Sequence, residues 1–410
     1  MALPERTESV GGDEISFPVE ELFYSRTDKS GLILSGNSVF QRISIYSWAE
    51  LKGRPHKIVR HPDMPRAVFF VLWDTIKKGR PVGAYVKNRA KDGRLYWVFA
   101  IATPTEDGYL SVRLKPSSAI LSVIKREYPQ HLAIEQRDRP TPADSAGLLV
   151  ARLAELGFAD YAHFMATALS TEIDARNQAL GRAPDRTIRI FRELVESAAS
   201  LMQQARLISV EYTKNQYVSR NLQILAAHLG QQGATIDVIS NNYELISAEI
   251  KRNMTSFVSS AQQVFDTVND GLFLVCTAKV QQELAKTARD EPALDGLSQD
   301  HEAHCLEQQH EAYRAKAIAG LREIARQTRA FREDCFEMGR LAGGLRVTSV
   351  MGRVECARLS AVNDGLQALL GDLDLFQETI ASGLKQIEHI NQTLQRDTEA
   401  LLLAEDELCV

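Results

Sequence analysis

Proline and tryptophan are scarce in most of this 410-residue chain. Only two of its 13 prolines, Pro184 and Pro292, follow residue 142, and all three tryptophans lie before residue 98. Long stretches without proline permit continuous helix, whereas proline and aromatic residues together favour short elements around a compact core. Because domains usually have about 100–200 residues, a chain of this length is expected to contain two or three domains. We therefore expect two physically different parts in series.

The sequence also lacks cysteine motifs, long apolar runs and a strong net charge. None of its five cysteines stands in a CxxC or other metal-ligand spacing, which disfavours a disulfide framework. No window reaches the ~18–20 apolar residues of a membrane span, and the first residues have no apolar signal-peptide core. A formal net charge of −5 gives no basic footprint for nucleic acid. We expect a soluble cytoplasmic protein with no transmembrane segment.

Residues 21–116, after a tail of residues 1–20, have the signals of a mixed α+β domain. Two short apolar runs around a turn at 28–31 predict a hairpin. Asn37 is a candidate cap of a short helix, and a longer helix is expected after Pro65, whose fixed φ suits a first turn. Strand-like runs separated by Asp-Gly turns close the segment, and they lie at 83–88, 95–104 and 109–114.

The order of these elements and several motifs resemble a PAS domain of the kind found in bacterial aerotaxis receptors. The resemblance covers about residues 23–104, and its most specific part is the run 59–65, Val-Arg-His-Pro-Asp-Met-Pro. Further matching positions are Gly31, Ile33, Asn37, Phe40, Gly53-Arg54-Pro55-His56, Trp73, Lys78-Gly79, Val86-Lys87-Asn88-Arg89, Lys91-Asp92-Gly93 and Tyr96-Trp97-Val98. The resemblance implies an α+β fold with a five-stranded antiparallel sheet and short helices, which holds FAD as a redox sensor.

The same resemblance implies candidate cofactor-binding residues. It places Arg60, His61 and Asp63 in the stretch needed for flavin binding. It also implies that Asn88 and Trp97 line the pocket, and Trp73 is a further candidate. A flavin needs apolar and aromatic walls, donors and acceptors for its ring edge and a cation near its phosphates, and these residue types can supply them.

Alternatives to a bound flavin stay open. Val82 stands where aerotaxis-type domains usually have a tryptophan, which leaves a looser pocket, a different cofactor or none. In a cofactor-free PAS module, Trp73 and Trp97 are simply core aromatics. Haem is the other alternative, with His56 or His61 as its ligand, although such a histidine is more often a hydrogen-bonded structural residue.

Residues 117–184 are expected to form a linker with short helices, and two long antiparallel helical hairpins follow. In the first hairpin, 185–288, apolar residues recur in alternating steps of three and four on both sides of a glycine turn at 230–233. The second, 301–408, repeats this pattern around a turn at 360–364. A lone hairpin leaves much of its apolar seam exposed to water, so the two hairpins are expected to pack as one four-helix coiled-coil bundle. Self-association between chains and a plain coiled-coil scaffold stay open.

Both turns resemble the cytoplasmic tip of methyl-accepting chemotaxis receptors. The first copy keeps Asn221, Ile224, Ala226, Ala227, Gly230 and Gly233 of that tip, and the second keeps Glu355, Ala357 and Arg358. The resemblance implies that the tip contacts a chemotaxis histidine kinase and its coupling protein, with Glu355 and Arg358 as candidate contact residues. Part of the methylation pattern is present at Gln203-Gln204, but the small residues that should follow are not.

An enzyme is not expected, because the sequence has no nucleotide-binding box of a kinase and no nucleophile–base arrangement. We expect a signalling protein of the chemotaxis-receptor type. Its PAS domain would sense redox, oxygen or energy state through flavin, and the change would pass through residues 117–144 to the helical hairpins. The alternative is a cofactor-free PAS and coiled-coil scaffold or adaptor in a chemoreceptor array or another assembly.

Overall fold

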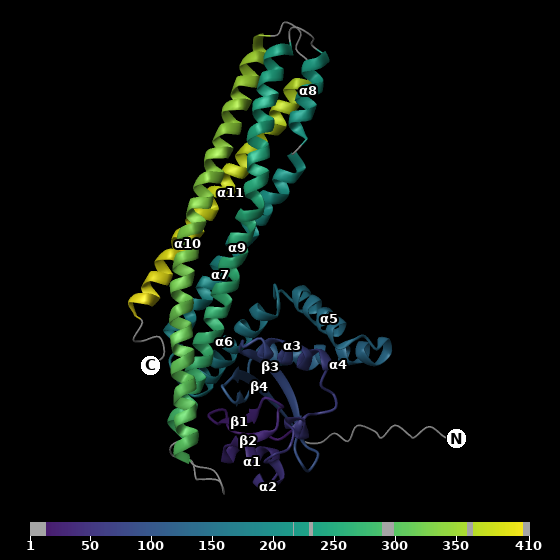
Figure 1. The fold of residues 1–410 in the computed structure, drawn as a ribbon. Coiled ribbons are helices and arrows are strands. Elements are labelled where there is room, and N and C mark those ends of the chain that lie inside the picture. Colours follow the sequence, from purple (N-terminus) through teal and green to yellow (C-terminus); the bar gives the residue numbers. More distant parts are fainter. Residues whose placement is uncertain (1–13, 216, 229–232, 289–298, 359–363, 405–410) are drawn as a thin grey trace, which may run out of the picture. The chain divides into compact units, whose positions relative to one another are not determined.

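The computed structural model describes residues 14–215, 217–228, 233–288, 299–358 and 364–404. These residues divide into two compact units. The described residues within 1–189 and 269–318 belong to the first unit, and those within 190–268 and 319–405 belong to the second. Figure 1 labels the elements of both. The two units therefore do not follow the order of the chain.

The first unit contains a five-stranded antiparallel sheet with the strand order β2-β1-β5-β4-β3. Its strands are β1 (Leu22–Asp28), β2 (Ile33–Gly36), β3 (Val82–Arg89), β4 (Leu95–Pro104) and β5 (Gly108–Leu114). This order confirms the fold class and the strands expected from the sequence. Successive side chains of a strand point to opposite faces. We call the face towards Trp73 the inner face and the face towards Tyr128 the outer face.

Short helices connect β2 to β3. They are α1 (Ser38–Ser44), α2 (Trp48–Leu51), the 3-10 helix η1 (His56–Val59) and α3 (Arg66–Lys77). The side-chain oxygen of Asn37 accepts a hydrogen bond from the backbone N of Phe40 at 3.2 Å, so Asn37 caps α1 as predicted. The carboxylate of Glu135 accepts from the backbone N–H groups of Arg66 and Ala67, both at 2.9 Å. It thereby satisfies open donors in the first turn of α3.

Residues 117–184, expected as a linker with short helices, form three helices. These are α4 (Ala119–Asp138), α5 (Pro142–Glu155) and α6 (Tyr161–Ala179). The 20-residue helix α4 stands where a linker is expected. Its helical pattern is hard to recognise in the sequence, because it contains Pro129 and its buried positions include the polar His131 and Glu135. The hydroxyl of Tyr128 in α4 donates to the backbone O of Tyr85 at 3.1 Å. This segment therefore packs on the outer face of the sheet.

A buried carboxylate joins α6 to the sheet. Glu172 is completely buried, and its oxygens accept from the hydroxyl of Tyr85 at 2.6 Å and from the hydroxyl of Ser118 at 2.6 Å. They also accept from the backbone N–H groups of Ser117 at 2.6 Å and Ser118 at 2.9 Å. One side chain thus satisfies four donors at the point where β5 leads into α4.

Residues from the long helices α9 (Ala234–Ala288) and α10 (Gln299–Arg358) complete the outer face. The buried Glu302 accepts from the hydroxyl of Ser35 at 2.7 Å and lies 3.5 Å from both the hydroxyl of Tyr24 and Nε of Arg26. The side-chain amide of Gln281 donates to the hydroxyl of Thr103 at 3.3 Å. The outer face is therefore covered by residues far away in the sequence.

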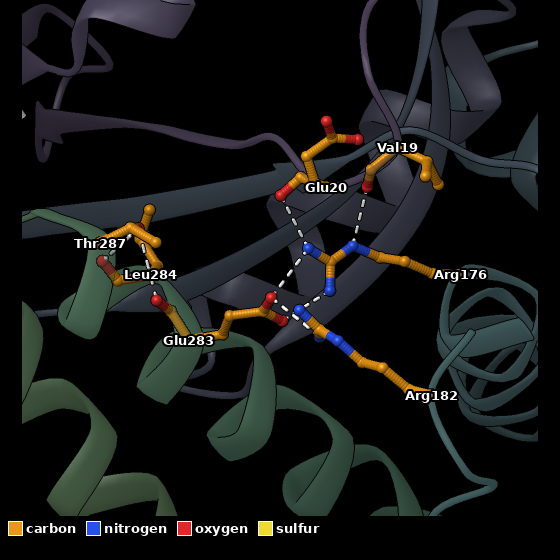
Figure 2. A network of polar contacts seen from close by, with 7 residues as sticks. All are labelled: Val19, Glu20, Arg176, Arg182, Glu283, Leu284 and Thr287. Atoms are coloured by element: carbon orange, nitrogen blue, oxygen red, sulfur yellow. Dashed lines mark hydrogen bonds and ion pairs between the residues drawn. The ribbon is translucent and has the colours of Figure 1, made fainter. Parts of the chain in front are cut away.

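A second polar network holds the segment before β1 against α6 and α9 (Figure 2). The guanidinium of Arg176 donates to the carboxylate of Glu283 at 2.5 and 2.9 Å, and to the backbone O atoms of Val19 and Glu20 at 2.9 and 2.8 Å. Arg182 donates to the same carboxylate at 3.1 Å. Burial alone raises the pKa of Glu283, but the two arginines outweigh it and hold that pKa below its usual value.

The second unit is a bundle of long helices (Figure 1). Besides parts of α9 and α10, it contains most of α7 (Arg186–Asn215), α8 (Val218–His228) and α11 (Asp364–Leu403). The predicted heptad positions are its core. Buried members include Phe191, Leu194, Leu201, Ile208, Tyr243, Phe257, Phe331, Met338, Leu373 and Phe376. The helical half of the predicted fold class is confirmed.

The parts of the two predicted hairpins that belong to the second unit, within 190–268 and 319–404, pack on each other. The rings of Phe257 in α9 and Phe331 in α10 stack with centroids 5.1 Å apart. Tyr212 in α7 lies 6.4 Å from Phe376 in α11. These contacts join residues of the first hairpin to residues of the second within one chain, which is the arrangement that the burial argument predicts.

The predicted turns at 230–233 and 360–364 lie outside the described residues, except for Gly233 and Asp364. Among the described helices, none combines the length and the hydrophobicity that crossing a membrane requires.

Candidate functional site

A cavity of about 360 Å³ lies against the inner face of the sheet. Residues of β1, β3, β4, β5, η1 and α3 line it. The cavity exists because the strands place small side chains there, among them Ser25, Ala100, Ala102 and Ser111. The residues between them in sequence point to the other face. This volume is within the range of about 300–1,000 Å³ that is usual for small-molecule sites.

Aromatic side chains form one wall of the cavity. Phe69 and Trp73 come from α3 and Tyr109 from β5. The rings of Trp73 and Tyr109 meet edge to face with centroids 5.5 Å apart. Gly31 has a positive φ of 84°, and a Cβ there would lie 3.4 Å from the Trp73 ring. That distance is an ordinary van der Waals contact, so the positive φ of the β1–β2 turn, and not the wall, favours glycine here.

A buried arginine that the sequence did not mark lines the same cavity. Arg113 is 3% exposed, and its guanidinium donates to the hydroxyl of Ser25 at 3.0 Å and the backbone O of Ser111 at 3.2 Å. Its Nη2 lies 2.6 Å from Nε2 of His56. Burial lowers the pKa of Arg113 to about 10, so it stays charged at neutral pH. Burial, and then the charges of Arg113 and Arg60, lower the pKa of His56 well below its usual value. His56 is therefore neutral.

Three of the six predicted cofactor residues line the cavity: Arg60, Trp73 and Asn88. Arg60 and Asn88 pair as an isolated backbone bridge, and the Arg60 guanidinium lies 3.4 Å from the centroid of Phe69. Within the described part of the chain, the buried Nε of Arg60 has no hydrogen-bond partner. Burial lowers the pKa of Arg60. These groups offer a cation, an amide and a flat aromatic surface to a ligand.

His61 and Asp63 lie beside the cavity and are not among its lining residues. The backbone N of His61 donates to the backbone O of Lys87 at 3.3 Å, and the Asp63 carboxylate accepts from Lys87 Nζ at 2.7 Å. The backbone N of Asp63 donates to Nδ1 of His61 at 3.1 Å. These contacts fix the run 59–65 to β3. They position Arg60, which precedes them, and do not reach into the cavity.

Trp97 belongs to the outer face. It is 8% exposed and packs against Tyr128 of α4 with ring centroids 6.1 Å apart. Ala100 and Ala102 of the same strand line the cavity, and Trp97 differs from them by an odd number of positions. Val82, the departure from the family pattern, is buried at the start of β3 and does not line the cavity either.

The alternative haem ligands do not favour that cofactor. Of the two, only His56 lines the cavity, and its Nε2 is already in contact with Arg113. Within the described ranges, His, Cys, Asp and Glu side chains form no cluster of three or more suited to a metal ion.

The candidate tip residues lie near the end of α10. Nη1 of Arg358 is 3.8 Å from the carboxylate of Glu355, one helical turn away. Arg358 is exposed and Glu355 is half-buried. Such a pair is an ordinary feature of a helix surface and by itself identifies no partner.

The sequence of residues 33–111 matches the PAS fold family. This match and the strand order decide the fold of the sheet domain. It is a PAS domain. Over 109 residues the chain is 41% identical to the aerotaxis receptor of Escherichia coli (strain K12). This match covers 25% of this chain and 22% of the receptor. The matched part is thus less than a quarter of the receptor's length.

Solved structures similar to the PAS domain include LOV domains. The light state of the blue-light photoreceptor Aureochrome1 LOV is 17% identical, covers 26% of this chain and 90% of its own, and has a TM-score of 0.24. The LOV domain of a blue-light activated histidine kinase from Erythrobacter litoralis is 18% identical, covers 22% and 90%, and has a TM-score of 0.21.

Proposed function

We propose that this protein is a signalling sensor of the chemotaxis-receptor type whose PAS cavity binds FAD by its flavin ring. The observation that carries the proposal is the cavity itself. It combines a wall of Phe69, Trp73 and Tyr109 with the amide of Asn88 and two arginines. The 41% identity of this region to an aerotaxis receptor supports a role in sensing oxygen or redox state.

The residues present fit a flavin. Flat aromatic side chains suit its ring, and buried donors suit the oxygen and nitrogen atoms at the ring edge. Arg60 supports this reading because its buried Nε lacks a partner among the described residues. Bound flavin would supply reversible electron transfer. Arg60, Asn88 and Arg113 would hold the ring edge, Trp73 and Phe69 would exclude water, and His61 and Asp63 would keep Arg60 in place.

The proposed signal leaves the cavity through β1. Ser25 faces the cavity and contacts Arg113, whereas its neighbours Tyr24 and Arg26 contact Glu302 of α10. A change in the hydrogen bonds of Arg113 would therefore move residues that touch α10. The expected route through 117–144 stays part of the proposal, with α4 in place of a linker.

The proposed output is contact with a chemotaxis histidine kinase and its coupling protein. Helices α9 and α10 have residues in both units, so they connect the sheet domain to the bundle along the chain. Glu355 and Arg358 remain the candidate contact residues. The match to the receptor covers only 22% of its length, so the partners are inferred from the type of protein and from the heptad hairpins. No catalytic step is assigned to this chain.

The absorption spectrum of the purified full-length protein tests the proposal. We expect flavin bands close to one equivalent per chain, either as purified or after incubation with FAD. Trp73→Leu removes part of the cavity wall and should lower the flavin content. Trp97→Leu is the matched control, because Trp97 lies on the outer face.

A protein that stays colourless after incubation with excess FAD would overturn the sensor reading and favour the cofactor-free scaffold. Equal flavin loss in both tryptophan variants, at equal helical content by circular dichroism, would remove the inner-face cavity from the proposal. A haem spectrum would replace the flavin by the other cofactor considered.

A further inference from the structure

The cavity contains a buried positive charge that no carboxylate of the described residues neutralises. The guanidinium of Arg113 is 3% exposed, and its hydrogen-bonding partners are neutral: Ser25 Oγ, Ser111 O and His56 Nε2. Its centre lies 5.7 Å from the ring of Phe23 and 5.4 Å from the ring of Phe40. Within the described ranges no carboxylate forms an ion pair with it.

This arrangement is unusual because a buried charge is costly unless it is paired. Elsewhere in the same unit, the buried guanidinium of Arg176 is paired with the carboxylate of Glu283 at 2.5 Å. The contact with His56 adds no negative charge, since burial and the neighbouring arginines keep that imidazole neutral. Aromatic faces offset only part of the cost of burying a cation. The cavity thus keeps a net positive charge where β5, the central strand of the sheet, lines it.

This positive charge would affect the redox chemistry of a bound flavin. A flavin gains negative charge when it accepts electrons, unless it takes up protons from solvent at the same time. A fixed cation nearby stabilises the electron-rich state more than the oxidised state. Because Arg113 is only 3% exposed, the effect of its charge is larger there than at the surface.

Resting on the proposed function, we propose that Arg113 is the positioning residue that sets the reduction potential of this site. It makes the cavity bind reduced FAD more tightly than oxidised FAD. The electrons come from a soluble donor, dithionite in the test below, which is oxidised as the flavin is reduced. No bond to the protein forms or breaks, and any proton comes from solvent.

A structural role for Arg113 makes a different prediction. If Arg113 only fills space between Ser25, His56 and the two phenylalanine rings, its removal weakens both redox states of the flavin equally. The reduction potential of the bound flavin then stays unchanged. The potential therefore separates the two roles, whereas flavin content alone does not.

The experiment uses the full chain loaded with FAD. The midpoint potential of bound flavin is measured by dithionite titration for the wild type, Arg113→Gln and Arg113→Lys. We expect Arg113→Gln to lose at least tenfold more affinity for the reduced form than for the oxidised form. This corresponds to a decrease of about 30 mV for a two-electron step, or about 59 mV for a one-electron step. Arg113→Lys keeps the charge and should stay within half of that decrease.

Arg94→Gln is the matched control, because Arg94 is an exposed arginine of the same domain. It should leave the potential unchanged. An unchanged potential in Arg113→Gln with flavin still bound would overturn the inference and leave the proposed function intact. A wild type that binds no FAD would overturn both.

The wild type alone provides a second readout if Arg113→Gln does not fold or retains no flavin. Preferential binding of the reduced form requires that the midpoint potential of bound FAD exceed that of free FAD under the same conditions. A bound potential equal to or below that of free FAD would overturn the role assigned to Arg113.

Discussion

The two faces of the PAS sheet solve the same problem, burial of polar groups, in opposite ways. On the outer face, hydroxyl and guanidinium groups meet carboxylates of the same chain: Tyr85 contacts Glu172, and Tyr24 and Arg26 contact Glu302. On the inner face, the hydrogen-bonding partners of Arg113 among the described residues are neutral. The outer face is also filled by large side chains, whereas small ones leave a cavity on the inner face.

The difference shows which face the chain completes by itself. Helices α4, α6, α9 and α10 supply polar partners to the outer face, among them the carboxylates of Glu172 and Glu302. The inner face has space and a positive charge that has no carboxylate partner among the described residues. A cavity with a buried cation that has no carboxylate partner among the described residues is suited to a ligand.

The largest expected effect concerns the carboxylate of Glu172. Replacing it in Glu172→Leu leaves the hydroxyls of Tyr85 and Ser118 and two backbone N–H groups without their acceptor in the interior. We expect the free energy of unfolding to fall by about 3–5 kcal/mol. Urea unfolding followed by tryptophan fluorescence measures it, because all three tryptophans lie in the PAS domain.

Glu106→Leu is the control for that change. Glu106 is exposed in the turn between β4 and β5, so its replacement should change the free energy of unfolding by less than about 0.5 kcal/mol. If Glu172→Leu cost as little as the control, the outer face would not depend on internal carboxylates, and the contrast between the two faces would fail.

Enlarging one side chain on each face should have smaller effects on the free energy of unfolding, and these effects should differ between the two faces. A Cβ at Gly83 on the outer face would lie 2.9 Å from ring atoms of both Phe273 and Phe99. Gly83→Ala should therefore lower the free energy of unfolding by about 1–3 kcal/mol. Ala100→Val adds methyl groups beside the cavity, where there is room, and should change it by less than about 1 kcal/mol.

The second readout of this pair is flavin content after incubation with FAD. Ala100→Val takes up cavity volume and should lower the content, whereas the folded fraction of Gly83→Ala should retain it. The reverse pattern, with a stable Gly83→Ala and an unstable Ala100→Val, would mean that the inner face is the packed one.

Much of this fold follows from local sequence patterns. The strands alternate and end at Gly-containing turns, and the heptad positions 191–212 become the core of the bundle. Helix α4 does not follow from them. Its buried positions include His131 and Glu135, which find partners in Ser145 and the first turn of α3, so its apolar periodicity is incomplete. Pro129 makes this helix still harder to predict from the sequence.

The site is less readable from the sequence. The run 59–65 and the resemblance that it carries direct attention to Arg60 and Asn88, and both line the cavity. Arg113 has only a faint local signal, its place in the alternation Tyr109-x-Ser111-x-Arg113 of β5. The pairing of Glu302 with Ser35 spans 267 residues. No local pattern specifies such a contact, because it depends on where α10 packs.

The smallest expected effect concerns Arg182, the half-exposed partner in the network of Arg176 and Glu283 (Figure 2). Arg182→Met should lower the free energy of unfolding by no more than about 1 kcal/mol near neutral pH, because exposed ion pairs are weak.

Burial opposes ionisation of Glu283, but the arginines hold its pKa below the ordinary 4.5. The pair is therefore fully stabilising above pH 4.5 and loses its effect as the pH falls through the lower, folded-state value. The difference between Arg182→Met and the wild type should shrink on acidification, while the exposed Arg80→Met should show no such trend. A difference that is independent of pH would mean that Arg182 acts through packing and not through Glu283, and that this carboxylate needs only one arginine.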